Sequence, residues 1–274
     1  MSAAALPGQA PATSQGVRGD FLVGERRLHL DCRGQAGPTV IIESGGGSAG
    51  TGDAGWTQIR DALRSRLRIC LYDRAGLGRS DAVRGPRRIE DFVGDLAGLL
   101  VAARIEPPYI LVGASFGGLI AAHFATRHRD KVLGMLLLDA VHPRQWQRAS
   151  ALLPTPDAHE ASALRAFREA AQRAISHSQQ AGFEGLDLAA TQLPLPGSLG
   201  AMPLTVLTAG RDEWAPGFPP ELARALREDW LAMQAEMLDL SSRSRHEVLP
   251  DSGHCVHIDD SLHVIETILA LAGH

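Results

Sequence analysis

The sequence has few cysteines, and their scarcity argues against a fold held together by disulfide bonds. Cys32, Cys70 and Cys255 are the only three among 274 residues, an odd number at distant positions. Cys32 and Cys70 lie in segments that read as strands. We therefore expect buried free thiols and no disulfide framework.

The sequence also lacks the uninterrupted apolar run of about 18 residues that a membrane-spanning helix needs. The formal net charge of -4 is spread along the chain without a basic stripe. We therefore expect neither a nucleic-acid nor a membrane partner. Residues 1–16 lack the basic and continuous apolar regions of a signal peptide, so the expected location is cytoplasmic.

What the chain does contain is the composition of a globular protein, with 45% apolar and 21% charged residues. Its length suits one large α/β domain, and no linker divides it. Residues 1–19 are expected to form a flexible N-terminal segment.

Short apolar runs alternate with amphipathic helical patterns along most of the chain. The apolar runs cover residues 39–43, 68–73, 109–113, 133–139 and 204–209, and the helical patterns cover residues 89–100, 222–237 and 262–269. Such runs are typical of parallel strands buried on both faces. The alternation predicts an α/β fold, an open and mostly parallel sheet covered by helices on both faces. A short antiparallel hairpin is expected between Phe21 and Cys32.

A proline-rich interruption separates two parts of this pattern, residues 20–141 and 201–274. It covers residues 142–200 and includes a helical stretch with Leu164, Phe167, Ala171 and Ile175 on one face. Because that apolar face needs burial, we expect a small helical lid over the strand ends rather than a disordered excursion.

Residues 113–117 read Gly-Ala-Ser-Phe-Gly and fit the pattern G-x-S-x-G. The motif follows an apolar run and opens a helical pattern, the context of a nucleophile elbow. A glycine-rich phosphate-binding turn or a chance match is the alternative. We favour the elbow, with Ser115 as nucleophile, because strand and helix both lie where the motif requires them.

A serine hydroxyl is a weak nucleophile and needs a base to accept its proton. Of eleven histidines, His254 alone follows the last strand-like run, on a loop just before the final helix. We predict that His254 is the general base. His254 and His257 lie three positions apart and could be read as a pair of metal ligands. That spacing alone is weak evidence, so no metal or cofactor is expected. Three other histidines are expected on helix surfaces or in loops: His123, His128 and His142.

Together, these segments resemble the α/β-hydrolase superfamily. The resemblance rests on residues 42–47, 72–80, the elbow and residues 252–254, and it covers nearly everything after the first twenty residues. It implies that the backbone N–H groups of Gly46 and Phe116 form an oxyanion hole. Ser44 stands where the family usually has a histidine, a departure that leaves the backbone donors in place. Residues 73–80 are interpreted as a structural loop beside the site.

Two places could supply the acid that orients the histidine. Asp139 ends the run 133–139, whereas Asp212 and Glu213 follow the run 204–209. The later place is the commoner one in the superfamily. However, in the relatives with a Leu-Thr-Ala-Gly-Arg strand end, an acid after that arginine is not a dependable feature, whereas the Asp-x-x-His-Pro pattern that begins here at Asp139 is. We favour Asp139 and keep Asp212 as the alternative.

A serine at the elbow favours acyl chemistry through an acyl-enzyme, so the expected substrate is a small-molecule carboxylic ester or a related lactone. Aromatic residues expected near the pocket are Trp146, Phe167, Phe183 and Trp214. Two other functions stay open: a non-catalytic α/β-hydrolase-fold protein that binds a ligand, and a cofactor-free perhydrolase. The sequence carries no signal for an oligomeric state.

Overall fold

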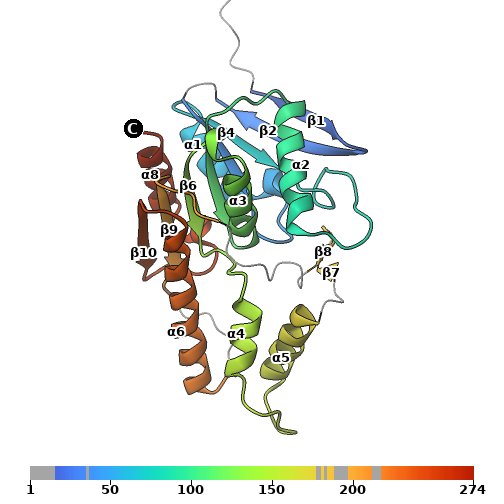
Figure 1. Cartoon of the computed structure of the whole chain (residues 1–274), viewed down its shortest axis with the longest axis vertical. Coiled ribbons are helices and arrows are strands. Elements are labelled where there is room, and N and C mark those ends of the chain that lie inside the picture. The colour runs from blue at the N-terminus through green and yellow to red at the C-terminus, as the bar shows by residue number, and fades with distance from the viewer. Residues whose placement is uncertain (1–15, 35–36, 177–179, 182–183, 188–196, 212–216) are drawn as a thin grey trace, which may run out of the picture.

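The computed structural model describes residues 16–34, 37–176, 180–181, 184–187, 197–211 and 217–274. Within this part of the chain, an eight-stranded sheet forms the centre of the molecule, in the order β1-β2-β4-β3-β5-β6-β9-β10 (Figure 1). The strands are β1 (Arg18–Val23), β2 (Arg26–Arg33), β3 (Thr39–Glu43), β4 (Arg68–Tyr72), β5 (Tyr109–Ala114), β6 (Val132–Leu138), β9 (Leu204–Ala209) and β10 (Ser244–Leu249).

Most of the sheet is parallel. β1 pairs with β2 and β2 with β4 in antiparallel register, and every other neighbouring pair is parallel. The predicted mostly parallel sheet and the N-terminal hairpin are thus confirmed. β1 begins at Arg18, inside the segment 1–19 that the sequence analysis expects to be flexible.

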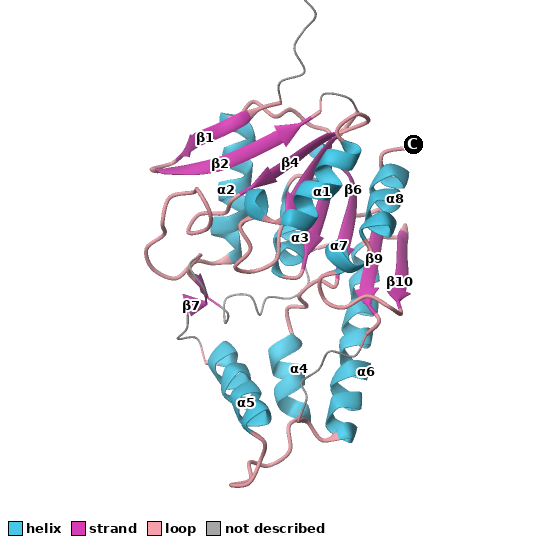
Figure 2. Cartoon of the chain, turned by 180° about the vertical axis from the view of Figure 1, so that it is seen from behind, coloured by secondary structure: helices cyan, strands magenta, loops and turns pink. Residues whose placement is uncertain are grey.

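Helices cover both faces of the sheet. One face carries α2 (Ile89–Ala102) and α3 (Phe116–Arg127), and the other carries α1 (Ala54–Leu63), α7 (Val256–Asp259) and α8 (Ser261–Leu271). Figure 1 shows the first pair in front of the sheet, and Figure 2 shows α1, α7 and α8 from behind. Two separate apolar clusters therefore form the core, one on each side of the sheet.

This double coverage explains the continuous apolar runs in the sequence. Every residue of β3 is buried, and so is every residue of β5. A strand covered on one face would alternate apolar and polar residues, whereas these strands must be apolar on both faces. Full burial of one such aliphatic side chain stabilises the fold by about 1.5–3 kcal/mol.

A layer of three helices lies beyond the carboxyl ends of the parallel strands (Figures 1 and 2). It consists of α4 (Gln145–Leu152), α5 (Ser162–Ile175) and α6 (Pro220–Glu236). An apolar cluster joins them at Ala149, Leu164, Phe218, Leu222 and Leu226. α4 and α5 lie within residues 142–200, the range that the sequence analysis predicts to form a lid, whereas α6 comes from outside that range.

Ion pairs attach α4 to α6. Arg148 of α4 donates from Nε to Asp229 Oδ1 at 2.8 Å and also pairs with Glu236. A short two-stranded sheet, β7 (Gln180–Ala181) and β8 (Leu186–Asp187), completes the described elements.

The expectation that all cysteines are free thiols is wrong. Cys32 of β2 and Cys70 of β4 are joined by a disulfide bond. The antiparallel register places these two residues directly opposite each other, although 38 positions separate them in the sequence. The sequence analysis could not foresee this pairing, because nothing local to either cysteine reveals that β2 is the neighbour of β4.

Among the described residues, the structure contains no helix that combines the length and the apolar character needed to cross a bilayer.

Candidate active site

Ser115 sits on a sharp turn between β5 and α3. Its φ is 50° and its ψ is -122°, in a region that side-chain-bearing residues rarely adopt. Such a conformation costs on the order of 1–3 kcal/mol and persists only when the surroundings impose it. Here the Ser115 N–H donates to Leu138 O and the Ser115 carbonyl accepts from Val141 N–H, both at 3.0 Å. The end of β6 therefore holds the strained turn in place.

The glycines of the elbow are required by close backbone contacts. A Cβ atom on Gly113 would lie 2.6 Å from Gly118 Cα, and one on Gly117 would lie 2.1 Å from Glu43 O. Neither distance leaves room for a side chain. The two glycines of the G-x-S-x-G pattern thus let α3 start directly against β3 and β5.

Asp139 follows β6 and is buried, with 4% of its surface exposed. Its carboxylate accepts three hydrogen bonds: Oδ2 from His254 Nδ1 at 2.6 Å, and Oδ1 from Trp230 Nε1 at 2.8 Å and from Ala209 N–H at 3.2 Å. Its φ of 42° is tolerated by aspartate better than by most residues. The carboxylate is therefore fixed in position, with Oδ2 directed at the imidazole.

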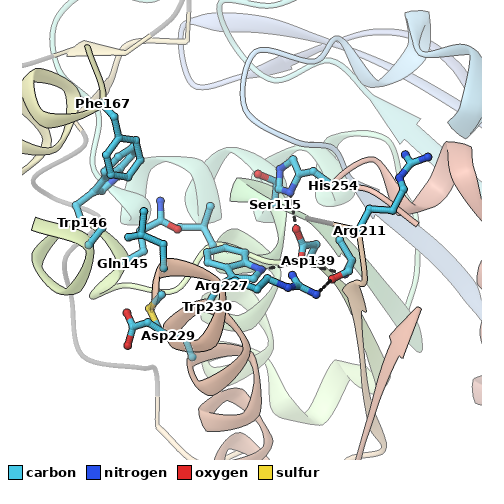
Figure 3. A pocket seen from close by; sticks show the side chains of 15 residues that line it. Ser115, Asp139, Gln145, Trp146, Phe167, Arg211, Arg227, Asp229, Trp230 and His254 are labelled. Carbon is cyan, nitrogen blue, oxygen red and sulfur yellow. Dashed lines mark hydrogen bonds and ion pairs between the residues drawn. The ribbon is translucent and has the colours of Figure 1, made fainter. Parts of the chain in front are cut away.

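His254 lies on the loop after β10, and its side chain is about half exposed, at 49%. Ser115, Asp139 and His254 line one cavity of about 350 Å³ (Figure 3). Asp139 thus contacts Nδ1 of an imidazole that lines the same cavity as Ser115.

The loop that carries the expected oxyanion donor follows β3 and runs beside the elbow. A Cβ atom on Gly45 would lie 3.6 Å from Ser115 Cβ, and one on Gly46 would lie 3.6 Å from Phe116 Cβ. Phe116 is the first residue of α3, so its N–H lies outside the intrahelical hydrogen-bond ladder. The two N–H groups named by the sequence analysis thus lie on backbone segments that meet at Ser115.

A network of buried charges holds this loop. Arg74, 3% exposed, donates to Ser44 O and Gly45 O, both at 2.6 Å. Its Nε donates to Glu184 Oε2 at 2.7 Å, and Glu184 Oε1 accepts from Gly47 N–H at 2.8 Å. The segment 73–80, interpreted as a structural loop, thus contacts the loop after β3 directly through Arg74.

Glu43 is the second carboxylate beside Arg74 and is fully buried. Its Oε2 lies 3.6 Å from Arg74 Nη1, and its Oε1 accepts from the Tyr72 hydroxyl. Burial raises the pKa of Glu43 to about 7, because desolvation outweighs the attraction of the Arg74 guanidinium. Glu184 is thus the closer counter-ion of Arg74.

The walls of the cavity are mostly apolar. Lining side chains from the helical layer are Trp146, Ala149, Phe167, Leu226, Trp230 and Met233. Arg211 and Arg227 add charge near the strand ends, and Arg227 donates to the carbonyls of Ala209 and Gly210 at 2.6 and 3.1 Å. Trp146 and Phe167 line the cavity as expected, whereas Phe183 and Trp214 lie outside the described residues.

Asp212, the alternative acid, and Glu213 also lie outside the described residues. Asp139 stays the predicted acid, and its 2.6 Å contact to His254 supports that prediction.

Two other histidines have surroundings that fit structural roles. The His257 ring stacks on Trp56, with centroids 4.2 Å apart, and its Nε2 lies 3.4 Å from Asp53 Oδ1. His142, expected in a loop or on a helix surface, lies in a loop but is buried, with 1% exposed. Burial lowers the pKa of His142 to about 4, because the charged form loses its hydration.

Sequence reasoning missed three residues that contact the groups of this site. The helical pattern places Trp230 on an apolar face, although a buried indole N–H requires an acceptor, which here is Asp139. In the sequence, Arg74 stands out only as a member of the segment 73–80, which the family resemblance marks as a structural loop. Glu184 carries no signal at all, since it reaches Arg74 across 110 positions of sequence.

Comparisons with known proteins bear on the family and the fold. The model of the alpha/beta hydrolase family matches residues 40–266. The uncharacterized protein YqjL of Bacillus subtilis is 29% identical over 228 residues, which are 83% of this chain and 81% of that protein.

Two solved structures show the same fold. An enol-lactonase from Burkholderia xenovorans LB400 superimposes with a TM-score of 0.63 at 20% identity, over 93% of this chain and all of that one. A thermophilic esterase from Thermogutta terrifontis superimposes with a TM-score of 0.62 at 21% identity, over 92% of this chain and 97% of that one.

Proposed function

The chain belongs to the alpha/beta hydrolase family, and we propose that it is a serine hydrolase that cleaves carboxylic esters through an acyl-enzyme intermediate. The observation that carries this proposal is the 2.6 Å contact between Asp139 Oδ2 and His254 Nδ1 in the cavity onto which Ser115 opens. That contact supplies what a serine nucleophile lacks, a base held in one tautomer.

In this mechanism the Ser115 hydroxyl attacks the ester carbonyl carbon while His254 Nε2 accepts its proton. Asp139 stabilises the imidazolium that results and keeps Nδ1 protonated throughout. The tetrahedral oxyanion accepts hydrogen bonds from the N–H groups of Gly46 and Phe116. Removing one such donor typically lowers kcat by about 10²–10³-fold.

The intermediate then collapses, and the alcohol leaves with the proton that His254 holds. Water attacks the acyl-Ser115 ester, gives a proton to His254, and releases the carboxylic acid while the serine recovers its proton. The net reaction adds one water across the ester bond, and no cofactor enters the balance.

The substrate class follows from the cavity and the relatives. A volume of about 350 Å³ with mostly apolar walls suits a small ester or lactone with a short to medium apolar group. The names of similar proteins, an esterase and an enol-lactonase, point to the same bond type. These similarities support acyl hydrolysis without specifying the natural substrate.

The test is hydrolysis of p-nitrophenyl acetate, butyrate and octanoate by the wild-type protein and by Ser115→Ala, with circular dichroism to verify folding. We expect turnover by the wild type, none above background by Ser115→Ala, and labelling by a fluorophosphonate that depends on Ser115. A folded wild type that is neither active nor labelled would favour the non-catalytic, ligand-binding alternative. Peracid formation that exceeds ester hydrolysis in peroxide would favour the perhydrolase.

A further inference from the structure

We infer that Arg74 and Glu184 are positioning residues that hold the Gly45–Gly46 peptide so that its N–H is directed at the developing oxyanion on the Ser115 adduct. This inference rests on the proposed function. It adds a role for two side chains that lie outside the triad, one of them from the insertion 142–200.

The argument begins with the peptide unit itself. The Gly45 carbonyl and the Gly46 N–H belong to one planar trans peptide, so they point in opposite directions. Arg74 Nη2 donates to the Gly45 carbonyl at 2.6 Å. Fixing the carbonyl on the Arg74 side therefore directs the N–H away from it.

This loop needs an external restraint. It contains three consecutive glycines, Gly45, Gly46 and Gly47, and glycine has the widest choice of backbone conformations. Within the described residues, the Gly46 N–H donates to no protein group, as an oxyanion donor must in the absence of substrate. A free donor on a glycine-rich loop keeps its direction only if the neighbouring groups are held.

Arg74 and Glu184 hold the peptides on both sides of that donor. Arg74 Nη1 binds the Ser44 carbonyl at 2.6 Å, and Glu184 Oε1 accepts from the Gly47 N–H at 2.8 Å. The two side chains are joined by the 2.7 Å bond from Arg74 Nε to Glu184 Oε2. Three successive peptide groups are therefore attached to one buried ion pair.

The same arginine also lies near the side chain of Phe116, the residue of the second proposed donor. The Arg74 guanidinium carbon lies 5.6 Å from the centre of the Phe116 ring. In the proposed mechanism Phe116 supplies the other oxyanion N–H. Arg74 therefore lies near the ring of one donor residue and binds the carbonyl of the peptide that carries the other donor. A charged donor on the Gly45 carbonyl also polarises that peptide, which strengthens the Gly46 N–H as a donor.

Glu184 reaches the site because its segment is anchored to the core. Arg87 N–H donates to Gly185 O at 2.8 Å, and Asp187 N–H donates to Arg87 O at 3.0 Å. The side chain of Glu184 is buried, with 2% exposed. This segment of the insertion therefore holds the Glu184 carboxylate beside the glycine loop, although it does not line the cavity itself.

The test compares Arg74→Met, Arg74→Lys and Glu184→Gln with a matched control, Arg60→Met. Arg60 is also buried, with 8% exposed, and pairs with Asp31 at 3.2 Å, but it does not line the cavity. Each variant is checked by circular dichroism and thermal melting. The readouts are kcat and KM for p-nitrophenyl butyrate and the inhibition constant of an aryl trifluoromethyl ketone, whose serine adduct carries a tetrahedral oxyanion.

We expect Arg74→Met to lower kcat by about 10²-fold with KM changed less than about threefold, and to weaken the ketone by a similar factor. Arg74→Lys should not restore kcat, because an ammonium cannot make the two-carbonyl fork of a guanidinium. Glu184→Gln should lower kcat by about tenfold. Arg60→Met should lose thermal stability but keep kcat and ketone affinity.

The inference is wrong if folded Arg74→Met keeps kcat within threefold of the wild type, or if its kcat falls without a parallel loss of ketone affinity. It is also wrong if Arg60→Met shows the same loss. Should Arg74→Met fail to fold, the same criteria apply to Arg74→Lys and Glu184→Gln. A wild type without esterase activity or fluorophosphonate labelling refutes the proposed function itself, a result distinct from an active wild type with unaffected variants.

Discussion

Replacing Asp139 with asparagine is expected to lower kcat/KM by about 10³–10⁴-fold while leaving the fold intact. The reason lies in how the carboxylate is held. Trp230 Nε1 and the Ala209 N–H both donate to Oδ1, and His254 Nδ1 contacts Oδ2. An asparagine at this position must present its oxygen to the two donors, because its amide nitrogen cannot accept from them.

The NH₂ group of the introduced asparagine then faces His254 Nδ1 and donates to it. A neutral imidazole that accepts at Nδ1 carries its proton on Nε2, where it cannot take the proton of Ser115. The substitution therefore selects the wrong tautomer rather than merely removing a charge. A loss of about 10³–10⁴-fold corresponds to about 4–5.5 kcal/mol of transition-state stabilisation.

The assay is kcat/KM with p-nitrophenyl butyrate for the wild type, Asp139→Asn and Asp212→Asn, each with a thermal melt. A loss in Asp139→Asn together with near wild-type activity in Asp212→Asn supports the acid at the end of β6. Folded Asp139→Asn with activity within tenfold of the wild type refutes the reasoning, and a large loss confined to Asp212→Asn moves the acid to that position.

Three further predictions follow from the described contacts. Trp230→Phe removes one hydrogen-bond donor to Asp139. In the same ester assay its kcat should fall by about tenfold, because a hydrogen bond to a charged group contributes about 1.5 kcal/mol or more. Ala149→Leu adds volume to the cavity wall, and its octanoate-to-acetate turnover ratio should fall by about tenfold, as expected for about 1–3 kcal/mol of crowding. In His142→Asn, the free energy of unfolding should fall less than in the wild type as the pH is lowered. The pKa of His142 is lowered to about 4 in the folded state, so its neutral form contributes stability above pH 6.5 that is lost as the pH falls through 4. Urea unfolding at pH 7, 5.5 and 4.5 measures the difference, at most about 3 kcal/mol between the two proteins.

Each of these three has an outcome that contradicts it. Unchanged kcat in Trp230→Phe means that the Ala209 N–H suffices to orient Asp139. An equal fall of acetate and octanoate turnover in Ala149→Leu means that this wall does not select chain length. Parallel stability curves for His142→Asn and the wild type mean that His142 is not forced to stay neutral in the fold.

The strand and helix pattern could be predicted from the sequence because both signals are local. The continuous apolar run of β5, the turn with Gly113 and Gly117, and the amphipathic pattern of α2 each depend on neighbouring residues alone. The prediction that Ser115 is the nucleophile is local for the same reason, since an elbow needs its strand, its glycines and its helix within a few positions. His254 required one further step, its place after the last strand-like run.

The partners of these residues were harder to predict because they come from distant parts of the chain. Asp139 and Asp212 both follow strands whose ends lie beside His254 in this fold family, so position along the sequence could not separate them. The contact at 2.6 Å across 115 positions favours Asp139, but it exists only after β6 and the loop following β10 have come together. The disulfide between Cys32 and Cys70 was missed for a similar reason, as it depends on which strands are neighbours.

The sequence by itself thus determined the fold class and led to the predicted nucleophile and base, because these inferences depend on local patterns of apolar residues and glycines. Only the tertiary structure decided what surrounds them: the three donors on Asp139, the pairing of Arg74 with Glu184, and the burial of His142. Those contacts are set by the packing of segments that lie up to 115 positions apart, and local propensity does not encode such distances.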